Sequence, residues 1–176
     1  TEGSNTNTKE TQTNVGGGYS TTDIAVNSGD DSPQVLSGGV ATVDSNSYTD
    51  IDEALTYWAS NGGTLKLLQN AEFPKAGADG KKKAITITAS NAVLDLNGKK
   101  LTASVSQALT VKGGQLTIKG DQDESVYEST SSAPVWVDEG GSVTLESGTI
   151  TAPGGKAYGV VGVKKKNASF VMNGGT

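Results

Sequence analysis

The sequence predicts an all-β fold, a parallel β-solenoid with one short helix near its N-terminal end. Short stretches that alternate apolar and polar residues recur along the chain, as in strands that bury one face. One series of these stretches begins at Ala84, Ala108, Ala133 and Ala157, which are 24 or 25 residues apart. A second series lies between them and begins at Val93, Gln115, Ser142 and Ser169. Two short strands in a period of about two dozen residues are typical of one coil of a solenoid, and about four to five coils are expected.

Equivalent apolar residues of successive coils should stack into ladders inside the solenoid, because alternate side chains of a strand point to the same side. Leu94 and Leu96 are expected to take the positions that Leu116 and Ile118 take in the next coil. Six residues are predicted to be buried in these ladders: Ile87, Leu96, Val111, Ile118, Val137 and Leu145.

Some segments extend or interrupt the repeat. Leu101 and Ile150 indicate a third short strand in the coil. The segment from Asp121 to Ser132 exceeds the repeat, and we expect it to bulge out as a loop. The last repeat stops at Thr176. At the equivalent point of the preceding repeat, the chain continues with an apolar strand residue, Ile150. We therefore expect an unfinished last coil, which is either cut or covered by something outside the repeat.

The chain is expected to divide into a polar tail at residues 1–38 and a β-helix domain at residues 39–176. Residues 1–14 contain no apolar side chain, so the tail cannot bury enough surface to offset the entropy of ordering alone. The tail is therefore interpreted as a linker, or as an extended segment that pairs with a sheet edge and uses Ile24 and Val26 to fill an apolar slot.

One helix is predicted at about residues 50–60, after a strand at Val40–Val43. Its apolar stripe has helical spacing and consists of Ile51, Ala54, Leu55 and Trp58. Thr49 is predicted to be the N-cap residue, and Gly62 is predicted to end the helix. Such a helix would cover the apolar side chains that the first coil of a solenoid exposes.

Composition excludes several classes of chemistry. The chain has 14 Lys and no Arg, 19 Asp and Glu, a net charge of −5, and neither His nor Cys. It therefore lacks bidentate phosphate clamps, the commonest general base, and all thiolate and disulfide chemistry. We expect no nucleic-acid partner, no cofactor, no metal site and no membrane span. A chain that is rich in Thr, Ser, Asn and Gly and free of Cys is typical of secreted or wall-associated proteins of Gram-positive bacteria.

Four stretches carry a resemblance to a known family: Ser47-Tyr-Thr-Asp-Ile-Asp-Glu-Ala-Leu, Gly62-Gly-Thr-Leu-Lys-Leu-Leu, Leu94-Asp-Leu-Asn-Gly-Lys-Lys-Leu-Thr and Leu116-Thr-Ile. Together they are similar to the parallel β-helix modules of large Firmicutes surface proteins, broadly within the pectate-lyase-like superfamily. The resemblance covers about residues 40–176. It implies a right-handed, three-faced helix and an extracellular setting. It implies no catalytic residues, because such modules are commonly adhesive or structural.

Acidic residues are the first candidates for a functional site. Carbohydrate-cleaving β-helix enzymes use clustered carboxylates as acid and base, or to hold calcium. The candidates here are Asp95, Asp138, Glu139 and Glu146. We favour the simpler interpretation, in which Asp95 tops a tight Asn-Gly turn and the other three are solvated.

Basic runs and one tryptophan are candidates for contacts with a glycan or a wall polymer. The basic runs are Lys81, Lys82 and Lys83, and residues 164–166; they could attract anions but more often form solvated turns. Trp136 lies between Val135 and Val137 and should point outward, where an indole can stack on a sugar ring. Alternatively, the loop from Asp121 to Ser132 covers it, with Val126 and Tyr127 as its neighbours, and we favour this arrangement.

The expected function is that of an extracellular adhesive or structural module without enzymatic activity. One alternative is a fragment of a polysaccharide lyase or glycoside hydrolase. Another is a subunit of an extracellular filament, in which the tail of one copy completes the last coil of the next. In that case the assembly residues would be Ile24, Val26, Phe170 and Met172.

Overall fold

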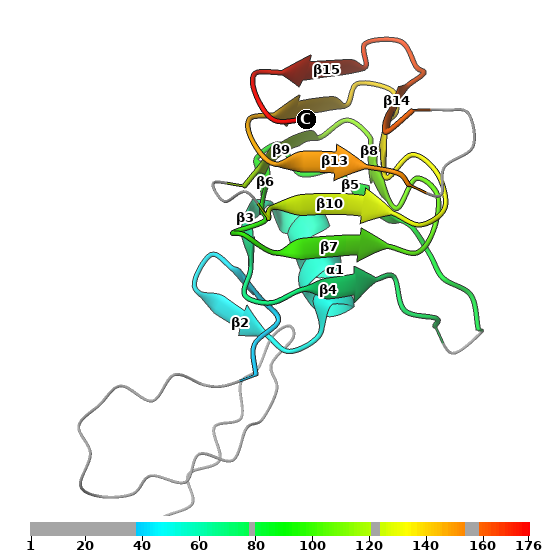
Figure 1. The fold of residues 1–176 in the computed structure, drawn as a ribbon. Coiled ribbons are helices and arrows are strands. Elements are labelled where there is room, and N and C mark those ends of the chain that lie inside the picture. The colour runs from blue at the N-terminus through cyan, green and yellow to red at the C-terminus, as the bar shows by residue number, and fades with distance from the viewer. Residues whose placement is uncertain (1–37, 78–79, 121–123, 154–158) are drawn as a thin grey trace, which may run out of the picture.

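The structure, a computed structural model, describes residues 38–77, 80–120, 124–153 and 159–176. This part of the chain forms a parallel β-solenoid with one helix, so the predicted fold class is confirmed (Figure 1). Four coils each contribute one strand to each of three stacked parallel sheets, and β15 begins a fifth coil. Residues 1–37 of the predicted tail, with Ile24 and Val26, lie outside the described residues.

The three sheets form the three faces of the solenoid, and we number the faces in the order in which the chain visits them. Face 1 contains β3 (Gly63–Leu67), β6 (Ala92–Asp95), β9 (Gln115–Lys119), β12 (Ser142–Leu145) and β15 (Ser169–Met172). Face 2 contains β4 (Ala71–Phe73), β7 (Lys100–Ala103), β10 (Val126–Ser129) and β13 (Thr149–Thr151). Face 3 contains β5 (Ile85–Ile87), β8 (Leu109–Val111), β11 (Val135–Val137) and β14 (Val161–Val163). A short antiparallel hairpin, β1 (Ala41–Val43) and β2 (Asn46–Tyr48), extends face 1 beyond β3.

The predicted core residues are all buried, but one of the predicted ladders has a different register. On face 1 the inward column runs through Leu65, Leu94, Ile118, Leu145 and Met172. Leu94, rather than Leu96, is thus the partner of Ile118. Leu96 lies one position past β6, at the corner between faces 1 and 2, where its backbone N–H donates to the carbonyl of Lys119. It is still buried there, because it points into the same core.

The prediction that Asp121 to Ser132 bulges out as a loop is wrong for the middle of the segment. Residues 126–129 form β10, which pairs in parallel with β7 and β13 and completes face 2 of the third coil. Tyr127 and Ser129 point inward and are buried. Residues 121–123 lie outside the described residues. The segment therefore supplies the third strand that Leu101 and Ile150 supply in the neighbouring coils.

Tyr127 is held in the core by one aromatic neighbour and one hydrogen bond. Its ring stacks on that of Phe73, with ring centroids 6.3 Å apart. The two residues are two coils apart, and the small Ala103 lies on the strand between them. The buried hydroxyl donates to the carbonyl oxygen of Pro134 at 2.9 Å. Burial raises the pKa of the Tyr127 hydroxyl well above its usual value, because the ring is cut off from water.

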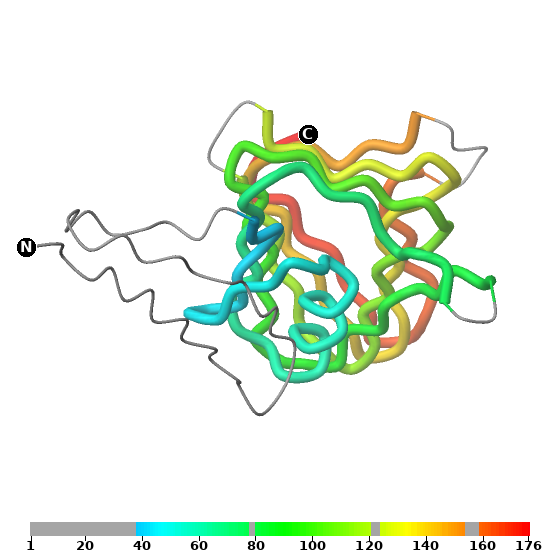
Figure 2. Tube along the Cα trace, turned by 90° about the horizontal axis from the view of Figure 1, so that it is seen from below, coloured from blue at the N-terminus to red at the C-terminus, as the bar shows by residue number. Residues whose placement is uncertain are grey.

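The helix α1 (Ile51–Asn61) closes the N-terminal end of the solenoid. Viewed along the solenoid axis, α1 lies within the outline of the coils (Figure 2). Its predicted apolar stripe is fully buried, and the indole N–H of Trp58 donates to the carbonyl of Gly63 at 3.0 Å. The N-cap is Asp50 rather than the predicted Thr49, because the Asp50 carboxylate accepts the N–H of Asp52 at 2.8 Å. Gly62 ends the helix as predicted, with a positive φ of 78°.

The last described coil has no such cover. The inward-pointing Val163 of β14, which ends the fourth coil, and Met172 of β15, which begins the fifth, are about half exposed, at 47% and 52%. Phe170 is partly buried against the core. The backbone nevertheless keeps the pattern of the repeat up to Thr176, which exchanges hydrogen bonds with the carbonyl of Gly148 and the N–H of Ile150.

Candidate functional site

Outward side chains of faces 1 and 2 are linked across coils by polar contacts. On face 2, Lys100 forms an ion pair with Glu128 of the next coil at 2.7 Å, and the hydroxyl of Thr102 donates to the same carboxylate at 3.3 Å. On face 1, Lys119 lies 3.6 Å from the carboxylate of Asp95. These contacts join neighbouring coils, so these side chains are engaged with one another.

The structure does not bring the candidate acids together. Asp95 is buried at the end of β6, where its carboxylate accepts the N–H of Asn97 at 3.0 Å and so caps the predicted Asn-Gly turn. Asp138 and Glu139 lie just before β12, whereas Glu146 lies just after it. Asp138 is also engaged locally, since it accepts the N–H of Glu139 at 2.8 Å. A general acid and base that act on one bond must converge on it, and these carboxylates lie at opposite ends of a strand.

The first basic run lies between β4 and β5, in the first coil. Lys81, Lys82 and Lys83 are all exposed. Lys82 is engaged, because its ammonium group donates to the hydroxyl of Ser104 at 2.9 Å and lies 3.8 Å from the carboxylate of Glu72. The run belongs to a different coil from Trp136, so the glycan-contact residues predicted from the sequence do not form one cluster.

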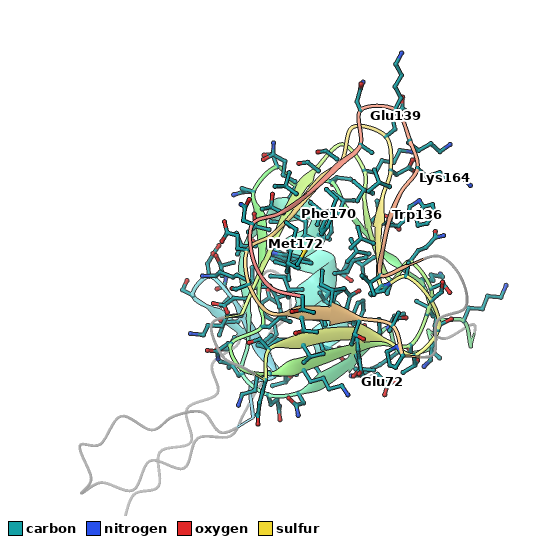
Figure 3. All side chains as sticks on the ribbon, turned by 45° about the horizontal axis from the view of Figure 1, so that its top comes forward. Glu72, Trp136, Glu139, Lys164, Phe170 and Met172 are labelled. Atoms are coloured by element: carbon teal, nitrogen blue, oxygen red, sulfur yellow. The ribbon has the colours of Figure 1, made fainter. Side chains whose placement is uncertain are left out.

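Trp136 points outward from the centre of β11, as predicted, but its neighbours are not those expected. Tyr127 is inside the core and Val126 is on face 2, so neither covers the indole. Instead the ring lies over Gly162 of β14, where an added Cβ would overlap Cε3 and Cζ3 of Trp136. The indole is half-buried. Figure 3 shows it on the outer side of the solenoid, on the same side as Lys164.

Gly162 is the residue of this face that the sequence interpretation missed. The signal was present: when the four coils are aligned, the central outward column of face 3 reads Thr86, Thr110, Trp136 and Gly162. A glycine directly beside a tryptophan in a stacked column leaves room for the ring to lie flat on the sheet.

The described residues hold no group of three or more Asp and Glu side chains that could bind a metal ion. In the same part of the chain, α1 is the one helix, and it is too short and too polar to cross a membrane. Comparisons with protein-family models, with curated proteins and with solved structures find no match to this chain.

Proposed function

We propose that the chain is an extracellular structural and adhesive module of a bacterial surface protein, with no enzymatic activity of its own. Its flat outer faces would contact glycans or wall polymers. The extracellular setting rests on the composition and on the resemblance to Firmicutes surface modules.

The observation that carries this proposal is the arrangement of the outward charges on faces 1 and 2. Lys100 with Glu128, and Lys119 with Asp95, are ion pairs between successive coils. Both carboxylates are largely covered, and each pair holds side chains of two successive coils together on the outer side of the solenoid. A surface whose charged side chains pair with one another across coils suits a scaffold better than a catalytic site, which needs convergent groups with shifted pKa values.

The enzyme alternative has a direct test. The chain is incubated with pectin, polygalacturonate and hyaluronan, with and without calcium, and reducing ends and unsaturated products are measured. We expect no turnover. In parallel, binding of the chain to a panel of neutral and acidic glycans is measured, and binding is expected. Turnover that is lost in Asp138→Asn or Glu146→Gln would overturn the proposal, and so would the absence of binding to every glycan of the panel.

Self-association is a second candidate function, favoured by the apolar surface of the last coil. Of the six large apolar side chains that are exposed in the described part, four lie on or next to the last two strands, β14 and β15: Val160, Val163, Val171 and Met172. Clustered apolar exposure next to a free strand edge favours pairing with another chain. Sedimentation velocity at high concentration should then show oligomers that are lost in a Val163→Lys, Met172→Lys double variant. Loss on deletion of residues 1–30 as well would identify the tail as the donated strand. A monomer at every concentration would exclude this candidate.

A further inference from the structure

The flat position of the Trp136 indole is built into two neighbouring strands of face 3. Val135 and Val137 point inward and are fully buried, which fixes Trp136 on the outside of β11. On the next strand, Gly162 lies beneath the ring, where any side chain would overlap it. Glycine weakens a strand interior, and it often marks a place where another group approaches closely. The pair therefore holds an aromatic ring along the sheet surface instead of projecting from it.

The surroundings of the ring are small or hydroxylated, so the ring is accessible. Thr110 and Thr86 lie on the other side of Trp136 in the same column. Thr110 is half-buried and Thr86 is exposed. Trp136 is itself half-buried, because its ring rests on the adjacent strand, and the rest of the side chain is open to solvent. Trp58, the other tryptophan, is completely buried beneath the coils. One indole of the molecule can thus meet a ligand and the other cannot.

Cations gather beside the indole. The residues that follow β8, β11 and β14 continue the ladder of face 3 and place Lys112, Asp138 and Lys164 in one column, as their backbone hydrogen bonds show. Lys165 and Lys166 follow and are exposed, and Glu139 lies at the same corner (Figure 3). Four lysines thus stand against two carboxylates in an acidic protein with a net charge of −5.

These lysines differ from three others of the chain that are engaged. Lys82, Lys100 and Lys119 each form an ion pair with a carboxylate of a neighbouring coil or segment. Within the described ranges no ion pair is formed by Lys112 or by the lysines at 164–166, and the nearby Asp138 carboxylate accepts a backbone N–H instead. The ammonium groups beside Trp136 are therefore available to an anion from outside the protein.

We propose that Trp136, Lys112 and Lys164 form a binding site for an acidic sugar residue of a glycan. An indole face offers apolar area with a defined orientation and little loss of conformational freedom, and it suits the C–H face of a pyranose ring. An adjacent ammonium group complements the carboxylate of such a sugar through a charge-assisted hydrogen bond. This inference rests on the proposed function, because it assigns the glycan contact to one place and one chemical class.

The test uses tryptophan fluorescence and the matched ligands 3′-sialyllactose and lactose. Because Trp58 is buried, a saturable change in emission reports on Trp136. We expect a change with 3′-sialyllactose in the millimolar range, and binding about tenfold weaker with lactose or at high salt, where charge contacts are screened. Trp136→Ala lacks this reporter, so its binding is measured by isothermal titration calorimetry beside that of the parent chain, and the substitution should abolish binding. A Lys112→Gln, Lys164→Gln double variant should reduce binding of 3′-sialyllactose to that of lactose, whereas the control Lys66→Gln, on face 1, should leave it unchanged.

Gly162→Ala provides a second test in which the indole is retained. The added methyl group must displace the ring from the sheet, so binding should fall although Trp136 is present. Circular dichroism confirms that each variant is folded. Absence of a saturable change in the parent chain, or equal binding by Trp136→Ala, would overturn the inference. If the chain bound glycans of the panel equally well with and without Trp136, the adhesive function would stand and this site would be wrong. Equal binding of lactose and 3′-sialyllactose would overturn the acidic specificity.

Discussion

The two ends of the solenoid place the same kind of side chain in opposite environments. The inward column of face 1 runs through one residue per coil: Leu65, Leu94, Ile118, Leu145 and Met172. The first four members are at most 1% exposed, whereas Met172 is 52% exposed. Leu65 belongs to the first coil of the described residues and Met172 to the last, so each has a described coil on one side only. The difference arises because α1 and the β1–β2 hairpin cover the first coil.

The comparison shows where burial comes from in this fold. A side chain inside a solenoid is covered by the coils before and after it, and little else. At the N-terminal end a helix replaces the missing coil, and its Trp58 and Leu55 are fully buried against the strands. At the other end of the described chain nothing replaces it. The predicted consequence is that equivalent substitutions have large effects in the interior and small effects at the open end.

The largest effect is expected for Leu94→Asp. Leu94 is fully buried between Leu65 and Ile118 of the adjacent coils, so a carboxylate there would be buried without a partner. Such a change costs on the order of 4 kcal/mol or more, which approaches the whole stability of a domain at the lower end of the usual range of about 5–15 kcal/mol. We expect the variant to be unfolded at room temperature, as judged by circular dichroism and urea titration. A cooperative transition with an unchanged midpoint would refute the interior position of this column.

Met172→Asp is the matched control, because Met172 occupies the same column in the last coil. Its side chain is already about half in water, so the new carboxylate remains solvated. The free energy of unfolding should change by no more than about 0.5 kcal/mol, as is usual for surface substitutions. A loss as large as that of Leu94→Asp would mean that the last coil is covered in solution.

The second largest effect is expected for Trp58→Ala in the cap. The change removes a fully buried ring and its hydrogen bond to the Gly63 carbonyl. We expect a loss of about 3–5 kcal/mol in the free energy of unfolding, as is typical for large buried aromatic residues. Val163→Ala, near the open end, should cost less than about 1 kcal/mol. Similar losses in the free energy of unfolding for the two variants, measured by urea titration, would contradict the proposed difference in burial between the two ends.

A smaller effect is expected at the start of the cap, where Asp50 has two roles. It caps α1, and its carboxylate pairs with the ammonium group of Lys75 at 2.7 Å. Asp50→Ala should cost about 1 kcal/mol, because the cap is lost. Asp50→Asn keeps a capping oxygen and loses only an exposed ion pair, so it should cost only a few tenths of a kcal/mol. Equal losses in urea titrations of the two variants would show that the charge, not the cap, is what matters.

The same residue gives this end a pH dependence. Partial burial opposes ionisation of Asp50, but hydrogen bonds from Lys75 and from the N–H of Asp52 outweigh it, so the pKa of Asp50 is lowered from 3.8. A lowered pKa in the folded state stabilises the fold above pH 3.8, and this contribution is lost as the pH falls through the lowered value. The small stability difference between the parent chain and Asp50→Asn should therefore shrink in acid. A difference that grows below pH 3.8 would contradict the assignment.

The sequence predicts the coils well because the repeat and the alternation act together. A shift by one residue would turn the buried column to water, so Ile118, Val137 and Leu145 could be placed without coordinates. The corners are less predictable. Leu96 continues the apolar alternation of β6 and is buried, although the strand ends at Asp95, so the sequence pattern does not mark the end of the strand. The strand β10 was missed because Tyr127 and Ser129 are not a typical apolar pair, and only the coils on either side reveal that this segment completes a face.

The candidate site was predictable only in part. The alternation around Trp136 places the indole outside, but its neighbours depend on which residues of other coils are in register with it. Gly162 and Lys112 are separated from Trp136 by two dozen residues or more, and their positions beside the ring follow from the parallel stacking alone. The engaged state of Lys82 likewise depends on Ser104 in the second coil.

Native-state hydrogen exchange tests the central claim, that α1 and the β1–β2 hairpin together do for the first coil what a neighbouring coil does elsewhere. The amides of β3, which pair with both β1 and β6, should be protected about as strongly as those of β9 in the middle of the solenoid. The amides of β15, which pair on one side with β12, should exchange by local opening, on the order of 100-fold faster. Exchange of β3 as fast as that of β15, or equal protection of all five strands of face 1, would contradict this account.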